Sequence, residues 1–85
     1  MSAKQKLEKI EEINNILRKY NLQIAPPRSD ANIPDYLNEV KPILSGRISA
    51  LLDKAEIKIN EGSINEARKI LKDVGEILKN YREIL

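Results

Sequence analysis

The chain has 85 residues and a net charge of +2, with 41% hydrophobic and 33% charged residues. This length supports one domain with a thin core, and the interspersed charges are typical of a solvated surface rather than of a dedicated nucleic-acid binder. Cysteine and histidine are absent, which excludes disulfides, ordinary zinc sites, cysteine nucleophiles and imidazole bases. We therefore expect a protein that is not an enzyme and that needs no cofactor.

The expected location is cytoplasmic. The N-terminal residues lack the apolar run of a signal peptide, and no stretch approaches the roughly 18 apolar residues of a membrane span. The richness in Ile, Lys and Glu fits a thermophile, and it fits an AT-rich genome equally well.

A first helix is predicted over residues 3–20. Ser2 and Gln5 have the spacing of a capping box, in which each residue bonds the other's backbone N–H. Asn21 can end the helix in a left-handed conformation. Apolar residues recur every three or four positions along one face: Ala3, Leu7, Ile10, Ile13, Leu17 and Tyr20, widened by Ile16.

Residues 21–31 form the predicted linker, in which Pro26 and Pro27 exclude a helix. Leu22, Ile24 and Ala25 are apolar, which is unusual for a solvated loop. Two interpretations stay open. The segment packs back over one end of the bundle, or it is an extended surface to which a partner docks.

A second helix is predicted over residues 33–60, with Asn32 as its N-cap and Pro34 in its first turn. Its apolar positions are Leu37, Val40, Leu44, Ile48, Leu51, Ala55 and Ile59. Pro42 interrupts this pattern without changing its phase. We expect one helix kinked near residue 42, with two shorter helices as the alternative.

The third helix is predicted over residues 64–84, after a short turn at Gly62. Ser63 and Glu66 have the spacing of a second capping box. The expected inward face is Ile64, Ala67, Leu71, Val74, Leu78, Tyr81 and Leu85, with Ile70, Ile77 and Ile84 flanking it. Short connections make neighbouring helices antiparallel, so residues 1–85 are predicted to form one all-α antiparallel three-helix bundle.

Candidate partner-binding residues are the apolar side chains that exceed the needs of a small core: Leu22, Ile24, Tyr36, Ile43 and Ile57. An alternative nucleic-acid surface uses the basic residues of the first helix: Lys4, Lys6, Lys9, Arg18 and Lys19. Interleaved glutamates lower the potential that phosphate binding needs there. The carboxylates form no convergent set, so no catalytic or metal site is predicted.

Residues 62–67, Gly-Ser-Ile-Asn-Glu-Ala, resemble the turn and second-helix start of a tetratricopeptide-type hairpin, with Leu51, Ala55, Leu71 and Val74 at matching offsets. Lys58 stands where that family has an aromatic residue, and only one copy is present, so the resemblance implies hairpin packing and not an array.

The chain's size, its Ile/Lys/Glu composition and its helical layout resemble the small polymerase-binding subunit of the archaeal replicative B-family DNA polymerase holoenzyme. That resemblance implies a non-catalytic subunit that binds a large polymerase and tunes its synthesis. The expected function is therefore a protein-interaction module, an accessory subunit of a larger complex. Direct nucleic-acid binding and a self-associating structural bundle are the alternatives.

Overall fold

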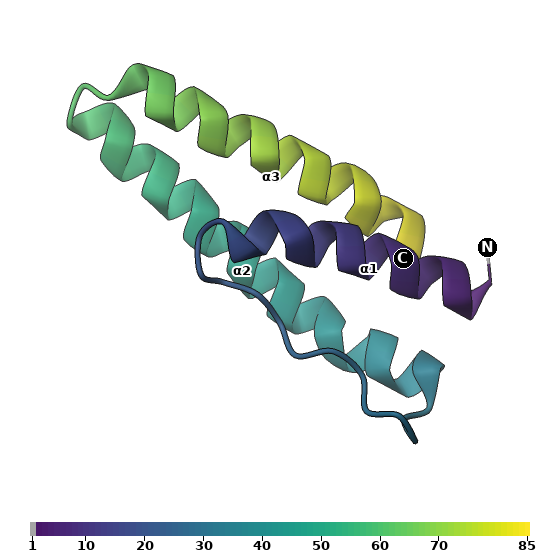
Figure 1. Ribbon diagram of the computed structural model, residues 1–85. Helices are drawn as coiled ribbons and strands as arrows, with labels where there is room; N and C mark the ends of the chain where they lie inside the picture. The colour runs from purple at the N-terminus through teal and green to yellow at the C-terminus, as the bar shows by residue number, and fades with distance from the viewer. Residues whose placement is uncertain (1) are drawn as a thin grey trace.

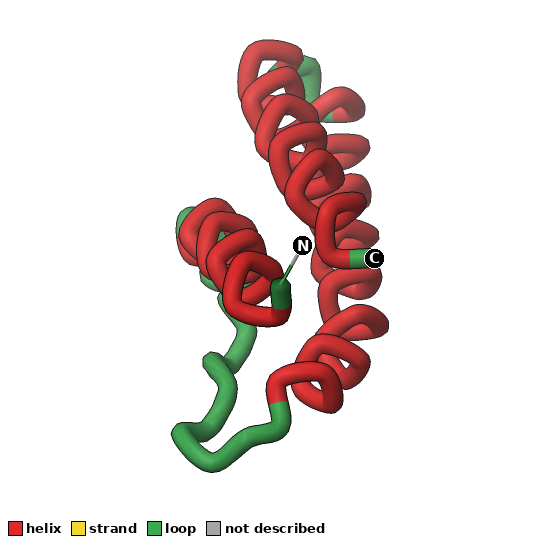
Figure 2. The backbone as a smooth tube through the Cα atoms, turned by 90° about the vertical axis from the view of Figure 1, so that its right-hand side faces the viewer, coloured by secondary structure: helices red, strands yellow, loops and turns green. Residues whose placement is uncertain are grey.

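Three α-helices account for the fold of this computed structural model, which describes residues 2–85 (Figure 1). They are α1 (Ala3–Arg18), α2 (Ile33–Asn60) and α3 (Ile64–Ile84). α2 and α3 form an antiparallel hairpin, and α1 lies along one side of it, whereas the other side of the pair is uncovered (Figure 2). The predicted all-α three-helix bundle is confirmed.

The core consists of aliphatic side chains from all three helices and from the linker. Its buried members are Ile10, Ile13, Leu17, Ile24, Leu37, Val40, Leu44, Ile48, Leu51, Ala55, Ala67, Ile70, Val74, Ile77 and Ile84. α1 packs more extensively against α3 than against α2. Burial of these side chains is the main term that stabilises the bundle.

Both N-terminal caps predicted for α1 and α2 are present. The Gln5 N–H donates to Ser2 Oγ at 3.2 Å and the Ser2 N–H donates to Gln5 Oε1 at 2.9 Å, which completes the capping box. Asn32 Oδ1 accepts from the Asp35 N–H at 3.1 Å. α1 ends at Arg18, two residues before the predicted position, and Asn21 adopts the expected left-handed conformation with φ of 58°.

Pro42 lies inside an unbroken α2, so the alternative with two shorter helices is wrong. Proline lacks the N–H that would bond the carbonyl one turn earlier. Its ring is exposed, and α3 supports this part of α2, because the Tyr81 hydroxyl donates to the Lys41 carbonyl at 3.1 Å.

The turn between α2 and α3 is closed by backbone bonds and not by the predicted capping box. Gly62 is left-handed with φ of 82°, and the Ser63 N–H donates to the Lys58 carbonyl at 2.8 Å, as in a Schellman motif. Ser63 has ψ of 64°, away from the extended backbone of a usual N-cap, and its side chain makes no cap bond. Glu66 instead pairs with Lys58 at 3.1 Å.

The inward face of α3 differs from the prediction. The three residues expected to flank the core, Ile70, Ile77 and Ile84, are buried. Four residues expected to form its centre are exposed: Ile64, Leu71, Leu78 and Leu85. The prediction for Ile59, expected on the inward face of α2, is also wrong, since this side chain is 48% exposed. The physical reason is the position of α1, which packs on the isoleucine side of α3 and turns the leucines towards the uncovered side of the hairpin.

The linker is fixed to the bundle by side chains from two helices. Asn14 is buried, and its amide group bonds both backbone groups of Ile24, accepting from the N–H at 2.7 Å and donating to the carbonyl at 3.1 Å. Tyr36 donates to the Ala25 carbonyl at 2.6 Å, and Arg47 donates to the Leu22 carbonyl at 3.0 Å. Of the two interpretations of the linker, packing against the bundle is therefore the one observed.

α1 is much shorter than the hairpin that it covers. With 16 residues against 28 in α2, it spans about 24 Å against about 42 Å. After α1 ends, the chain still contacts the hairpin through Tyr20, whose hydroxyl donates to Asp73 on α3 and whose ring lies below the Lys54 ammonium on α2. The turn end of the hairpin extends beyond this point (Figure 1).

Candidate interaction surface

The five predicted partner-binding residues fall into two groups. Ile24 is only 5% exposed, and Leu22 and Tyr36 are half-buried against the core. These three side chains hold the linker in place, and Ile24 is not accessible to a partner. Ile43 and Ile57 are exposed on α2, at 44% and 55%.

Three of these residues share a hollow between the linker and α2. Its volume is about 800 Å³, and its walls include Ile24, Tyr36 and Ile43. Charged side chains of both signs surround it, among them Arg47 and Glu39. Ile57 is not part of this hollow. The structure therefore brings together Ile24, Tyr36 and Ile43 and leaves Ile57 apart.

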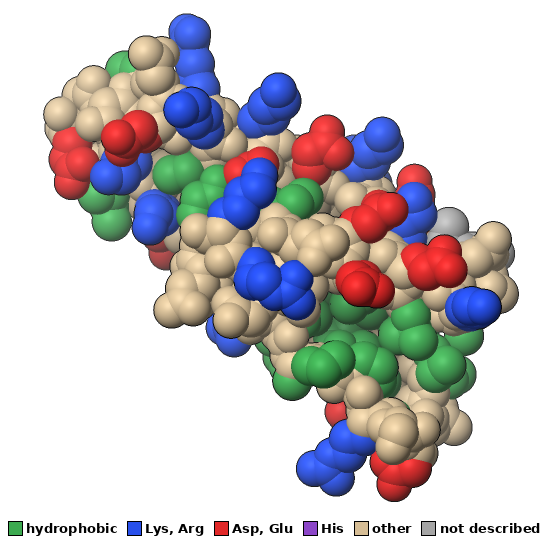
Figure 3. All heavy atoms as spheres, in the orientation of Figure 1, with side chains coloured by type: hydrophobic (Ala, Val, Ile, Leu, Met, Phe, Trp, Pro, Cys, Tyr) green, Lys and Arg blue, Asp and Glu red, His purple; other side chains and the backbone are tan. Residues whose placement is uncertain are grey.

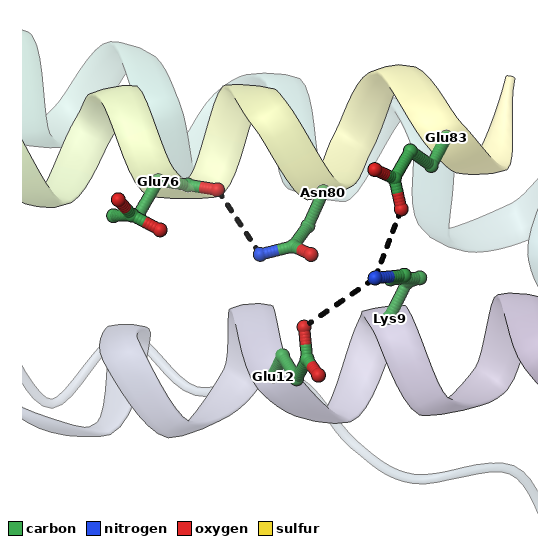
Figure 4. Close-up of polar contacts among 5 residues, drawn as sticks. All are labelled: Lys9, Glu12, Glu76, Asn80 and Glu83. Atoms are coloured by element: carbon green, nitrogen blue, oxygen red, sulfur yellow. Dashed lines mark hydrogen bonds and ion pairs between the residues drawn. The ribbon is translucent and has the colours of Figure 1, made fainter.

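The five basic residues predicted for nucleic-acid contact do not form one patch. Lys4 and Lys9 are five positions apart on α1, which places them about 140° apart around its axis. Lys9 pairs with Glu83 of α3 at 2.9 Å and lies near Glu12 (Figure 4). The face that carries α1 shows acidic and basic side chains interspersed (Figure 3).

The remaining basic residues of this set are also divided. Lys6 is half-buried, Arg18 donates to the Asn15 side chain at 2.6 Å, and Lys19 pairs with Asp73 of α3 at 3.5 Å. The ion pair with Asp73 neutralises part of the positive charge that Lys19 would offer to a phosphate backbone.

Three ionisable groups are held in one protonation state by their neighbours. The hydrogen bond and charge of Glu83 raise the pKa of Lys9, and Glu66 raises the pKa of Lys58 in the same way. Burial raises the pKa of Tyr20 to about 12, with the hydrogen bond to Asp73 as the second cause. Each of these groups therefore keeps its proton near neutral pH and maintains its contact there.

A row of exposed apolar residues lies on the side of the α2–α3 hairpin away from α1. We call it the outer stripe, and it consists of six aliphatic side chains that are each 41% to 66% exposed: Leu52, Ile59, Ile64, Leu71, Leu78 and Leu85. Single exposed aliphatic residues are ordinary on soluble proteins, whereas contiguous apolar patches mark interaction sites.

Helical geometry places these residues on one side. Residues seven positions apart differ by only about 20° around the axis, as do Leu52 and Ile59 on α2 and the four stripe residues of α3. Lys54 and Asp73, which both contact Tyr20 just after α1, each lie two positions after a stripe residue and therefore about 160° away from it around the helix axis.

Near the C-terminal end of α3, the stripe borders a hollow between the two helices. There the Ser45 hydroxyl oxygen of α2 lies 3.3 Å from the Tyr81 hydroxyl of α3. A hollow of about 320 Å³ there is lined by Ser45, Ile48, Leu78, Tyr81, Arg82 and Leu85. An apolar groove between two packed helices can receive a third helix.

On each helix, a row of exposed residues lies three positions before the stripe residues and flanks the stripe. We call these two rows the rims. On α3 the rim contains Arg68, Gly75 and Arg82, and on α2 it contains Ser49 and Glu56. A Cβ atom added to Gly75 would meet nothing within 4 Å. The α3 rim is therefore basic with a small residue at its centre, and the α2 rim is small and acidic.

Sequence reasoning missed the outer stripe, because none of its residues was among the predicted partner contacts. A signal was present, since Ile64, Leu71, Leu78 and Leu85 are separated by seven positions each. The nearby repeat of Ile70, Ile77 and Ile84 has the same spacing, so the sequence could not show which column faces inward.

Two further observations concern the described residues. Within residues 2–85, no three acidic side chains lie close enough together to hold a metal ion. None of the three helices contains a stretch that is long and apolar enough to cross a membrane. Comparison with models of protein families, with curated proteins and with solved structures gave no match to this chain.

Proposed function

We propose that this protein is a non-enzymatic interaction module that binds an amphipathic helix of a partner along the outer stripe. The observation that carries the proposal is the alignment of six exposed aliphatic side chains on one side of the hairpin. Covering that surface would remove apolar area from water, which is the main driving force of protein association.

A helix fits this surface better than an extended peptide does. The stripe consists of two apolar columns on packed helices, with no free sheet edge to which a strand could be added. A seven-residue repeat is the spacing with which helices maintain contact along a shared seam.

The same proposal includes a role as accessory subunit of a larger complex in the cytoplasm. The resemblance to the polymerase-binding subunit makes a replicative DNA polymerase the first candidate partner. Direct nucleic-acid binding through α1 has less support, because its basic residues do not form one patch and because Lys9 and Lys19 pair with acidic residues of α3.

Affinity capture from extract of the native cells tests the proposal. The bait would be compared with the double variant L71Q/L78Q, and the control would be I57Q, which removes a more exposed apolar side chain outside the stripe. We expect a partner at near-equal amount with the natural chain and I57Q, and its loss with L71Q/L78Q.

Circular dichroism would establish that all three proteins have equal helical content. A partner retained by L71Q/L78Q but lost with I57Q would refute the outer stripe as the docking face. Recovery of nucleic acid that nuclease removes, with no protein partner, would refute the interaction module itself and favour direct nucleic-acid binding.

A further inference from the structure

We propose that the helix that occupies the outer stripe comes from a second copy of this chain. This inference rests on the proposed function, since it identifies the occupant of the same groove. Two hairpins would face each other across a twofold axis parallel to the helices, and α3 of each copy would lie on α2 of the other. The product is a four-helix seam with one α1 on each outer side.

The apolar columns are spaced for such a seam. Ser45, Leu52 and Ile59 on α2 are seven positions apart, and so are the four stripe residues of α3. Helices that keep a seven-residue apolar repeat wrap around each other in the left-handed geometry of coiled coils and four-helix bundles.

Position along the hairpin determines which residues would meet. A twofold axis parallel to the helices leaves every residue at its own height along that axis. Residues of α2 and α3 that lie at the same height within one hairpin would therefore also lie opposite each other across the interface. The Lys58–Glu66 ion pair at 3.1 Å marks one such level between α2 and α3.

At equal distances from this level, the residues of the two rims are complementary in charge or similar in size. Glu56 lies two positions before Lys58, and Arg68 lies two positions after Glu66, so an acid of one copy faces a base of the other. Ser49 lies nine positions before Lys58, and Gly75 lies nine positions after Glu66. Small residues would thus meet at the centre of the rims, where they allow helices to approach closely.

The charges also select this arrangement over the other symmetric one. A twofold axis perpendicular to the helices would place α3 against α3 and bring the basic rim residues Arg68 and Arg82 of the two copies together. Like charges across an interface disfavour that pairing. The arrangement with α3 on α2 instead forms the Glu56–Arg68 contact twice.

Sedimentation at increasing protein concentration tests the inference. The mass is expected to rise from 9.7 kDa towards twice that value in the natural chain and in I57Q, and to stay at 9.7 kDa in L71Q/L78Q. A dimer that is unaffected by L71Q/L78Q would use another face, and the inference would be wrong.

Charge reversal at the exposed rim provides a second test that does not disturb the core. E56R would give two Arg–Arg contacts per dimer and R68E two Glu–Glu contacts, so each variant alone should dimerise about tenfold more weakly. Mixed in equal amounts, the two variants should form a heterodimer in which both contacts are attractive. Absence of this rescue would overturn the inferred register.

Failure of the inference is distinguishable from failure of the proposed function. A chain that stays at 9.7 kDa at all concentrations, yet captures a partner that L71Q/L78Q loses, would refute the second copy as occupant and retain the interaction module. A chain that neither dimerises nor captures a stripe-dependent partner would refute both.

Discussion

At the scale of single residues, the linker depends on Asn14. Its buried amide group bonds both backbone groups of Ile24, a residue that is itself only 5% exposed, and buried backbone groups need such partners. One side chain on α1 thereby determines the path of a segment ten residues later in the chain.

Replacing Asn14 with alanine should lower the free energy of unfolding by about 2–4 kcal/mol, because a buried donor and a buried acceptor lose their partners. Urea unfolding measures this loss. N15A is the matched control, since Asn15 is exposed and bonds only the Arg18 side chain. A loss no larger than that of N15A would show that the Asn14 bonds are dispensable and that the other contacts of the linker hold it in place.

Tyr20 should make stability depend on pH in the alkaline range. Its pKa rises from 10.0 to about 12 in the folded protein, first through burial and then through the bond to Asp73. The unfolded chain therefore loses this proton first. The contribution of Tyr20 to stability is complete below pH 10 and is lost as the pH rises towards 12.

Y20F lacks the ionising phenol, so its denaturant midpoint should fall less than that of the natural chain over this pH range. The comparison removes the contributions of Lys9 and Lys58, which both proteins share. Equal slopes in the two proteins would mean that Tyr20 titrates alike in the folded and unfolded states.

At the scale of helices, α2 contains one proline in its interior and one in its first turn. A proline in a helix interior costs about 3 kcal/mol relative to alanine, whereas proline is tolerated in the first turn. Pro42 is of the first kind and Pro34 of the second.

P42A should therefore raise the free energy of unfolding by about 1–2 kcal/mol, after allowance for the greater freedom that alanine gives the unfolded chain. P34A should give no such gain. Thermal unfolding of both variants checks this expectation. Unchanged or lower stability in P42A would mean that the packing of Tyr81 against Lys41 requires the local shape that proline imposes.

The helices illustrate what local sequence can and cannot predict. Periodicity located all three helices, and the caps at Ser2 and Asn32 formed as predicted because they involve neighbouring residues only. The capping box at Ser63 did not form, because the Ser63 backbone takes part in the Schellman turn and Glu66 pairs with Lys58 of the preceding helix. Both contacts depend on how the hairpin closes, which the local pattern does not contain.

The orientation of α3 was beyond prediction for a similar reason. Leu71 and Leu78 follow directly after Ile70 and Ile77, so two adjacent apolar columns share one spacing. Only the position of α1 determines which column is covered. The predicted partner residues Ile43 and Ile57 are indeed exposed. The outer stripe could be recognised only once the packing of the hairpin against α1 was known.

At the scale of the whole molecule, the linker shows how tertiary contacts choose between interpretations of one segment. Its apolar residues suited either a docking strand or a packed segment. Long-range bonds from Asn14, Tyr36 and Arg47 select the packed segment. Such bonds join residues 10 to 25 positions apart, and no local rule predicts them.

Because α1 is short, one part of the α2–α3 hairpin is covered by a third helix and the other part is not. At one end of the molecule three helices share a core. The end with the turn is a two-helix arm, and Ala67 is the buried side chain of α3 that lies nearest to the turn. Fewer buried contacts permit local opening, so amide hydrogens near the turn should exchange with deuterium well before those of Leu44 and Ile77.

Ile59 and Ile64 of the outer stripe lie on this two-helix arm, while Leu78 and Leu85 lie at the end where three helices share the core. A partner bound along the whole stripe would join the two parts and suppress the opening of the arm. Its binding should therefore slow hydrogen exchange around Gly62, at residues that the partner does not touch, and the protein would transmit occupancy of its groove as a change in motion and not in shape.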